Sequence, residues 1–160
     1  MNKRGITFIE LITVIAIMSI IFLIVVPKTN IALNFKERKD FKELKRDIIY
    51  ARNMSIVDVK RYSLDIYPKE GYYYINRHDN KKKISRIKKK VFESNLKMIS
   101  VNFTGSNSSE FGQLIFSITG APSMGGNIQL KNSKGQNIKL TIEVATGKVN
   151  IYIDGEKQDE

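Results

Sequence analysis

Residues 6–26 form an almost unbroken apolar run whose length matches a helix that crosses a lipid bilayer. The run reads ITFIELITVIAIMSIIFLIVV, and its only polar members are Thr7, Glu10, Thr13 and Ser19. A helix needs about 20 apolar residues to cross the hydrocarbon core, where it satisfies its own backbone hydrogen bonds. We therefore expect residues 6–26 to be a transmembrane helix.

An amphipathic helical pattern follows the apolar run. Apolar and small residues recur at steps of three and four, the spacing of one helix face: Phe41, Leu44, Ile48, Ala51 and Ser55. Charged residues occupy the other faces, which we expect to be solvated: Glu37, Lys39, Asp40, Lys42, Lys45 and Arg46. We expect residues 27–58 to continue the first helix, so that residues 6–58 form a rod on the order of 80 Å at ~1.5 Å per residue.

From residue 59 the pattern changes to short extended runs separated by turns. The predicted strands cover residues 62–67, 72–76, 96–103, 113–118, 127–130, 138–144 and 148–153. Turn residues lie between many of them, as in Pro68-Lys69-Glu70-Gly71 and Thr146-Gly147. The predicted fold class is α+β, with a long N-terminal helix packed on an antiparallel β head domain that spans residues 59–160.

Composition argues against an enzyme. The 160 residues include no Cys and one His, His78, which we expect in an exposed turn. Thiol nucleophiles, disulfides and Cys-ligated metals are therefore excluded, and a His-dependent triad is hard to build. We expect no catalytic residue, no metal site and no cofactor.

The net charge of +11 is concentrated in the middle of the chain. Residues 28–98 carry 20 basic and 9 acidic residues, whereas residues 99–160 carry 5 and 6. Such asymmetry favours an anionic partner, such as nucleic acid or lipid head groups. The alternative is a compositional bias towards Lys, Ile and Asn that only decorates solvated surfaces.

Glu10 distinguishes the apolar run from simpler N-terminal segments. The run is longer than the 7–15 apolar residues typical of a secretory signal, and no small-residue cleavage site follows it. A plain membrane anchor fits the length but gives no reason for an ionisable side chain, which is costly inside a membrane and usually functional.

Lys3-Arg4-Gly5 followed by Ile6-Thr7-Phe8-Ile9-Glu10 resembles the leader and first mature residues of type IV pilins and pseudopilins. The family pattern is a short basic leader that ends in Gly, an apolar residue, and Glu at the fifth mature position. Pro27 falls where these proteins often carry a helix-bending proline. Ile6 departs from the pattern, because Phe is the commonest first mature residue.

The resemblance implies how the N-terminus is processed and used. Residues 1–5 are the leader, which prepilin peptidase removes by cutting between Gly5 and Ile6 before the new amine of Ile6 is methylated. Glu10 is the partner of a neighbouring subunit's N-terminal amine during filament assembly, and Pro27 bends or ends the membrane helix. A buried charge pair of this kind is satisfied at only one axial offset between helices, so it sets the register.

A second, looser resemblance covers the C-terminal part. The segments at residues 112–122, 126–130 and 142–149, which include Gly120-Ala121-Pro122 and Thr146-Gly147-Lys148, look like the end of minor pseudopilins of the H type (GspH) and FimT-like minor pilins. The small minor pilins of competence systems are in the same group. Together the two resemblances imply a pilin-like fold.

A basic cluster in the middle of the chain is the strongest candidate for anion or DNA binding. It consists of Lys81, Lys82, Lys83, Arg86, Lys88, Lys89 and Lys90. Tyr72, Tyr73 and Tyr74 are close in sequence and can stack on unpaired bases. The alternative is a solvated loop, or charge that protects an edge strand from aggregation.

The predicted function is that of a minor pilin or pseudopilin that primes or caps a type IV pilus, a competence pilus or a type II secretion pseudopilus. Expected partners are prepilin peptidase, other pilin subunits, an inner-membrane assembly platform and the lipid bilayer. The expected location is the cytoplasmic membrane, with the head outside the cytoplasm. The alternative is an unassembled, membrane-anchored protein that binds nucleic acid. Lys28, Lys36 and the basic residues after them favour a cytoplasmic head by the positive-inside rule, but the leader motif is more specific.

Overall fold

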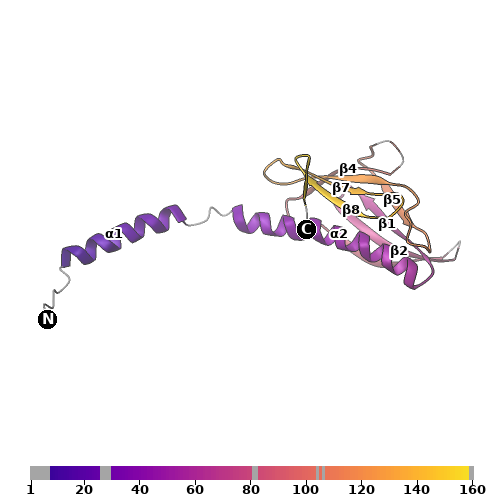
Figure 1. Cartoon of the computed structure of the whole chain (residues 1–160), viewed down its shortest axis with the longest axis horizontal. Helices are drawn as coiled ribbons and strands as arrows, with labels where there is room; N and C mark the ends of the chain where they lie inside the picture. Colours follow the sequence, from indigo (N-terminus) through magenta and orange to yellow (C-terminus); the bar gives the residue numbers. More distant parts are fainter. Residues whose placement is uncertain (1–7, 26–29, 81–82, 104, 106, 159–160) are drawn as a thin grey trace. The chain divides into compact units, whose positions relative to one another are not determined.

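The computed structural model describes residues 8–25, 30–80, 83–103, 105 and 107–158, which form two helices and nine strands (Figure 1). The helices are α1 (Phe8–Val25) and α2 (Asn30–Val57). The strands are β1 (Arg61–Tyr67), β2 (Tyr72–Asn80), β3 (Lys83–Val91), β4 (Lys97–Asn102), β5 (Gly112–Phe116), β6 (Gly126–Lys131), β7 (Asn137–Ile142), β8 (Val149–Ile153) and β9 (Glu156–Gln158). Residues 26–29 lie outside the described part, so helix continuity across them stays a prediction.

Helix α1 contains most of the apolar run. Two of its hydroxyl groups are satisfied locally, because those of Thr13 and Ser19 donate to the carbonyl oxygens of Ile9 and Ile15, each at 2.8 Å. Glu10 lies in the first turn, where the helix dipole favours a negative charge. Among the described residues, no helix combines the length and apolarity needed to cross a membrane.

Helix α2 buries the face that the sequence pattern predicts. Leu44, Ile48 and Ala51 are fully inaccessible, and Phe41 is 5% exposed. The helix ends at Val57, one residue before the predicted end. Two acids expected on the solvated side are instead buried, since Glu37 and Asp40 are each 3% exposed.

The strands form two antiparallel sheets. The sequence pattern predicts antiparallel sheet but does not predict that the strands divide into two sheets. The four-stranded sheet has the order β3-β2-β1-β5, and the five-stranded sheet has the order β4-β6-β7-β8-β9. Each of the seven predicted strands is present within a few residues of its expected bounds. Strands β3 and β9 are not among the predicted strands, and each lies at the edge of its sheet.

One hydrophobic core joins α2 to both sheets. Helix α2 contributes Leu44 and Ile48, the four-stranded sheet contributes Leu64, and the five-stranded sheet contributes Ile128 and Leu140. The alternation of buried and exposed residues along β6 and β7 places one face of that sheet inward. Residues 34–160 accordingly form one compact unit. From here on we call this unit the head; it contains the predicted β head domain, residues 59–160, and the part of α2 that begins at residue 34.

Two glycines of the C-terminal motif lie against the second half of α2. Gly120 and Gly147 both adopt positive φ, 79° and 63°, which favours glycine. A Cβ atom at Gly120 would lie 2.6 Å from a side-chain carbon of Ile56, and one at Gly147 would lie 2.9 Å from a side-chain carbon of Arg52. The positive φ therefore favours glycine in both turns, and at Gly120 a side chain would also displace Ile56.

Candidate functional site

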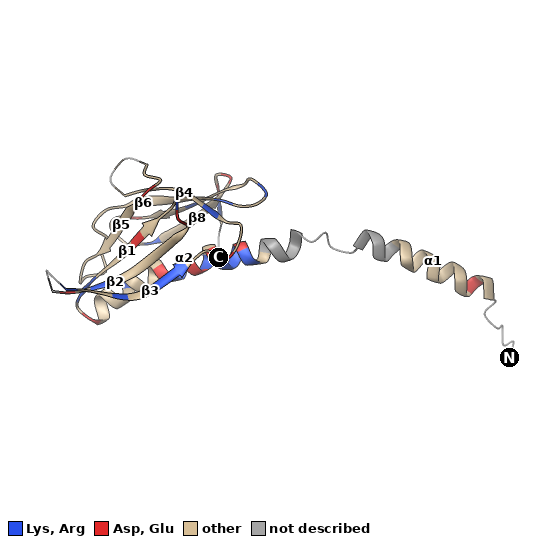
Figure 2. Ribbon diagram, turned by 180° about the vertical axis from the view of Figure 1, so that it is seen from behind, with Lys and Arg blue, Asp and Glu red and all other residues tan. Residues whose placement is uncertain are grey.

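Strand β3 carries two lysines towards the carboxylates of α2. Lys88 Nζ lies 2.9 Å from Glu43 Oε1 and 2.8 Å from Asp47 Oδ2. Lys90 Nζ lies 3.0 Å from Glu43 Oε2 and 3.6 Å from Asp40 Oδ1. Figure 2 shows β3 beside α2, with the basic strand next to the acidic positions of the helix. These ion pairs attach the edge strand to the helix.

The electrostatics of this cluster favour the charged forms. Burial opposes ionisation of Glu43, but Lys88 and Lys90 outweigh it and lower the pKa of Glu43. Burial likewise acts against the charge on the two lysines, but hydrogen bonds to Asp47 and Glu43 raise the pKa of Lys88, and Glu43 raises the pKa of Lys90. These two carboxylates and two ammonium groups form a network of opposite charges.

Three carboxylates of α2, those of Glu37, Asp40 and Asp47, also accept hydrogen bonds from polar groups at the core boundary. Tyr73 Oη donates to Asp47 Oδ2 at 2.6 Å, and burial, followed by this hydrogen bond, raises the pKa of Tyr73 far above its usual range. Asp40 accepts the backbone N–H of Ser94 at 3.0 Å, and Glu37 accepts that of Ser133 at 2.9 Å. These acids of α2 therefore form hydrogen bonds and ion pairs with other residues of the head.

The opposite side of β3 carries cations over aromatic rings. The Arg86 guanidinium lies 3.7 Å from the centroid of the Tyr74 ring, and Lys89 Nζ lies 4.9 Å from that of Tyr72. Tyr72 and Tyr74 pack together at 5.1 Å between centroids, and Tyr67 lies 4.8 Å from Tyr72. These are cation–π and aromatic contacts on an accessible sheet face.

The structure thus places the described residues of the predicted basic cluster on two different sides of β3. Lys88 and Lys90 face α2 and are paired with acids, whereas Arg86 and Lys89 face outward. Lys83 is exposed at the start of β3. Lys81 and Lys82 lie outside the described residues, as do the processing residues Gly5 and Ile6 and the predicted helix-bending residue Pro27.

The positions of Tyr73 and His78 differ from those that the sequence predicts. Tyr73, predicted with its neighbours to stack on bases, is fully buried and faces α2, because alternate residues of a strand point to opposite faces. His78 is not in a turn but lies in β2, half-buried, with Nε2 3.0 Å from Ser63 Oγ. The prediction was therefore wrong for the role of Tyr73 and for the position of His78.

A polar cluster at the end of β2 stabilises the corner between α2 and the sheet. Hydrogen bonds from Lys60 at 2.7 Å and Ser85 at 2.6 Å lower the pKa of Asp79 below its usual range. Burial and a hydrogen bond to Asp58 raise the pKa of Tyr62 to about 12. Among the described residues, no group of His, Cys, Asp or Glu side chains could hold a metal ion.

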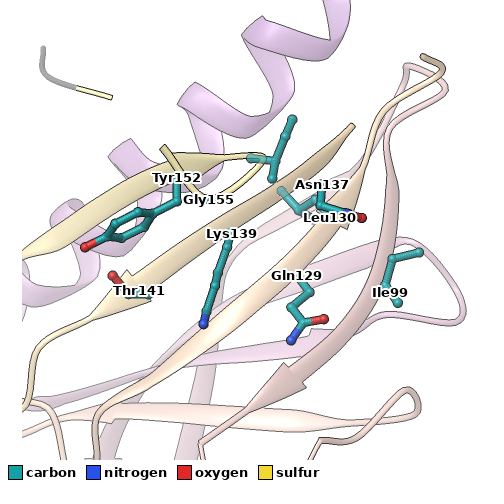
Figure 3. A pocket seen from close by; sticks show the side chains of 9 residues that line it. Ile99, Gln129, Leu130, Asn137, Lys139, Thr141, Tyr152 and Gly155 are labelled. Atoms are coloured by element: carbon teal, nitrogen blue, oxygen red, sulfur yellow. The ribbon is translucent and has the colours of Figure 1, made fainter. Parts of the chain in front are cut away.

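A shallow pocket of about 600 Å³ lies on the outward side of the five-stranded sheet (Figure 3). Lys139, Thr141 and Tyr152 project into it from β7 and β8, and Ile99 and Gln129 line it from β4 and β6. Its lining side chains include no His, Cys or carboxylate, which are the usual general bases. Lys139 and Tyr152 are its titratable side chains.

The roles of Asp40, Glu43 and Asp47 were not predicted, although the sequence carries a signal for them. These acids recur at steps of three and four residues on α2, and Lys88 and Lys90 recur at a step of two in β3. Each set therefore lies on a single face of its own element. Only the tertiary structure shows that the two faces meet.

Comparison with solved structures identifies the fold of the head. The minor pseudopilin EpsH from the type 2 secretion system of Vibrio cholerae matches with a TM-score of 0.63 at 8% identity, over 77% of this chain and 99% of EpsH. The type IV minor pilin FimU from Pseudomonas aeruginosa strain PAO1 matches with a TM-score of 0.56 at 16% identity, over 79% of this chain and 98% of FimU. No protein-family model and no curated protein matches the chain. The protein therefore has the fold of type IV pilins and pseudopilins.

Proposed function

We propose that this protein is a minor pilin or pseudopilin. The supporting observation is that a pilin-like head follows an N-terminal sequence with a basic leader, Gly5, an apolar run and Glu10. An apolar run alone also fits a plain membrane anchor, whereas a protein with both features is suited to be cut, methylated and assembled. The protein then primes or caps a type IV pilus, a competence pilus or a type II secretion pseudopilus.

In this proposal the N-terminal run has two successive environments. Residues 6–26 first hold the subunit in the cytoplasmic membrane, with the head outside the cytoplasm, and later pack among other subunits. The described apolar side chains of α1 are accessible in the isolated chain, with Phe8 79% and Ile15 57% exposed. A helix that is apolar on all sides requires lipid or protein around it. Lys3 and Arg4 favour a cytoplasmic leader.

The first experiment is the mass and N-terminal sequence of the protein from native membranes. Processing by prepilin peptidase predicts a chain that starts at N-methylated Ile6. An intact leader, in cells with active peptidase, would contradict the proposal and favour a plain membrane anchor.

A second experiment tests the assembly role of Glu10. Glu10→Gln removes the charge and keeps the size, so membrane insertion should persist while co-purification with other pilin subunits falls at least tenfold. Thr13→Val is the matched control, because the Thr13 hydroxyl bonds within its own helix. Unchanged co-purification of Glu10→Gln would exclude the register role.

The alternative function, a membrane-anchored module that binds polyanions, is favoured by the outward side of β3. Arg86 and Lys89 lie there over Tyr74 and Tyr72, an arrangement of cations and rings that suits single-stranded nucleic acid. This function does not need leader cleavage, so the N-terminal mass separates the two.

A further inference from the structure

The side chain of Arg52, in the second half of α2, lies beside two glycine turns of the head. A Cβ atom at Gly147 would lie 2.9 Å from Arg52 Cδ and 3.0 Å from Arg52 Nε, and one at Gly120 would lie 3.6 Å from Arg52 Cγ. The Cβ position at Gly147 is also 3.5 Å from the carbonyl oxygen of Gly120, so the two turns are close to each other. We call Arg52 and these turns, residues 117–121 and 143–148, the Arg52 site.

Arg52 has no counter-charge among the residues that the structure describes. Its Nε atom is buried and makes no hydrogen bond, and no carboxylate of the described residues pairs with its guanidinium. Buried polar groups are normally hydrogen-bonded, and buried charges are normally paired. Because the side chain as a whole is only half-buried, part of it stays accessible to a partner from outside the head.

The other arginine with a buried Nε is different. Arg77 Nε lies 2.9 Å from Asp79 Oδ1, so its charge is paired within the head. Such a pair offsets much of the free energy that is lost when a charged group leaves water. Arg52 is therefore the buried cationic group whose partner the described part of the chain does not supply.

The acids next to the Arg52 site already have other partners. Glu143, in the second turn, accepts hydrogen bonds from Asn150 Nδ2 at 2.8 Å and from Thr146 Oγ1 at 2.9 Å. Asp58, the first acid along the chain after this arginine, accepts a hydrogen bond from Tyr62. Both carboxylates thus stabilise local structure, and neither forms an ion pair with the guanidinium.

Exposed apolar side chains lie on all three segments that form the site. Ile56 of α2 is exposed beside Gly120. Ile118 of the first turn and Val144 of the second turn are both more than half exposed. An arginine among apolar side chains is typical of protein interfaces, where the apolar contacts exclude water from the charged group. A phosphate would match the charge but would leave these apolar side chains in water.

We propose that the Arg52 site binds an Asp or Glu side chain of a different subunit, whose apolar neighbours cover Ile56, Ile118 and Val144. A carboxylate fits the planar guanidinium through two parallel hydrogen bonds. A second copy of this chain is disfavoured, because two chains of net charge +11 repel each other. This inference rests on the proposed function, because it names the contact between the assembled subunit and its neighbour.

Site-specific photo-crosslinking in the full chain, within native membranes, tests the proposal. The crosslinking residue replaces Ile118, which leaves Arg52 in place, and the matched control replaces Ile84, an exposed isoleucine of β3. The expected product joins position 118 to a different pilin-like chain, at a segment with Asp or Glu among apolar residues. A product with a second copy, with nucleic acid, with lipid or with a segment that lacks an acid would overturn the proposal. The same product from position 84 would also overturn it.

Variants of Arg52 provide the second measurement. Arg52→Met removes the charge and keeps a long unbranched side chain, so the position-118 product should fall at least tenfold. Arg52→Glu should abolish the product, and exchange of the matching partner acid for Arg should restore it. Lys131→Met, which removes one charge at the exposed end of β6 opposite Gly126, should leave the product unchanged. An unchanged product after Arg52→Met would contradict the docking role.

Head stability separates docking from an internal structural role. Because Arg52 has no partner among the described residues, Arg52→Met should leave the Tm of the detergent-solubilised full chain unchanged or raise it. The substitution removes a buried donor that makes no hydrogen bond, which costs the folded state nothing. A Tm lowered by several degrees would mean that Arg52 stabilises the head itself, and would overturn the proposal.

The two proposals can fail separately. If the chain is processed at Gly5 and co-purifies with pilin subunits, but position 118 gives no Arg52-dependent product, only the docking inference is wrong. If the leader is intact and position 118 still reaches an acidic segment of another chain, the docking site stands and the pilin function is wrong. If the leader is intact and no product forms, both are wrong.

Discussion

Helices α1 and α2 show two different ways in which sequence can specify a helix. Helix α1 is apolar on all sides, and its described side chains, residues 8–20, are exposed in the isolated chain. Helix α2 is amphipathic, and one face is completely buried by the head's own sheets. The apolar face of α2 is therefore covered by other parts of the same chain. We propose that lipid and neighbouring subunits cover the apolar surface of α1.

We propose that the acidic side chains of the two helices also have different roles. In α2, Asp40, Glu43 and Asp47 lie within reach of lysines, amides or a tyrosine of the same head. In α1, we propose that Glu10 meets its functional partner on another subunit. An acid in an apolar setting therefore indicates a partner, but only the structure shows whether that partner is internal.

The largest expected effect is a loss of head stability when a buried side chain of α2 is shortened, which we do not expect for an exposed side chain of α1. Leu44→Ala removes a fully buried side chain and should lower the free energy of unfolding of the head by about 2–5 kcal/mol. Ile17→Ala, at a 52% exposed position of α1, should leave head stability unchanged. Denaturant unfolding of the detergent-solubilised full chain, followed by tyrosine fluorescence, measures both. Equal losses of unfolding free energy in the two variants would contradict the conclusion that α2, and not α1, is part of the head's core.

The next effect tests the attachment of β3 to α2. Lys88→Met keeps the aliphatic part of the side chain but removes one ammonium group from Glu43 and Asp47. It should lower the free energy of unfolding of the head by about 1–2 kcal/mol. The estimate is modest because the Lys88 side chain is 36% exposed, so water screens the pair. Lys89→Met, one residue away on the outward side, is the control. A larger loss for Lys89→Met would contradict the observed orientation of the strand.

A smaller, pH-dependent effect follows from the same ion pairs. The pKa of Glu43 is lowered in the folded head from an ordinary value of 4.5. Its stabilising contribution is therefore complete above pH 4.5 and is lost as the pH falls through the lower folded value. The raised pKa values of Lys88 and Lys90 mean that their contributions decline only in alkali, above the ordinary value of 10.5.

Thermal melting of the wild type and of Lys88→Met at several pH values measures this contribution. The difference in Tm between the two proteins should be constant near neutrality and should narrow below pH 4.5, as Glu43 becomes protonated. A difference that widens in acid would contradict the role assigned to Glu43.

The smallest expected effect concerns the outward side of β3. Arg86→Glu with Lys89→Glu removes two exposed cation–π contacts and should lower the free energy of unfolding of the head by about 1 kcal/mol. If this face binds polyanions, the same change should abolish the retention of a poly-dT oligonucleotide at low salt. Wild-type protein that does not retain the oligonucleotide would exclude the alternative function.

Much of the architecture could be predicted from local pattern. The buried positions Leu44, Ile48 and Ala51 follow directly from a spacing of three and four residues, because a single helix face must contact the core. Strands such as β7 and β8 alternate clearly and are bounded by turns. Strand β3 was not predicted, since a half-exposed edge strand rich in lysine lacks the apolar signal of a central strand.

The site could be predicted only in part. The basic cluster was recognised, but its division between Lys88 and Lys90 on one side and Arg86 and Lys89 on the other requires the register of β3 on β2, which includes a bulge. A register shift of one residue would exchange the two faces of the strand. Local sequence carries little information about such a shift.

The sequence by itself determined the apolar run, the leader motif with Gly5 and Glu10, and the buried face of α2, because each depends on residues close together along the chain. The tertiary structure decided that Glu37, Asp40 and Asp47 turn inward and that the cations of α2 turn outward. Their partners lie about 25 to 100 residues away in sequence. Only folding brings such distant groups within hydrogen-bonding distance, so charge sign and helical spacing alone could not assign these acids to the core.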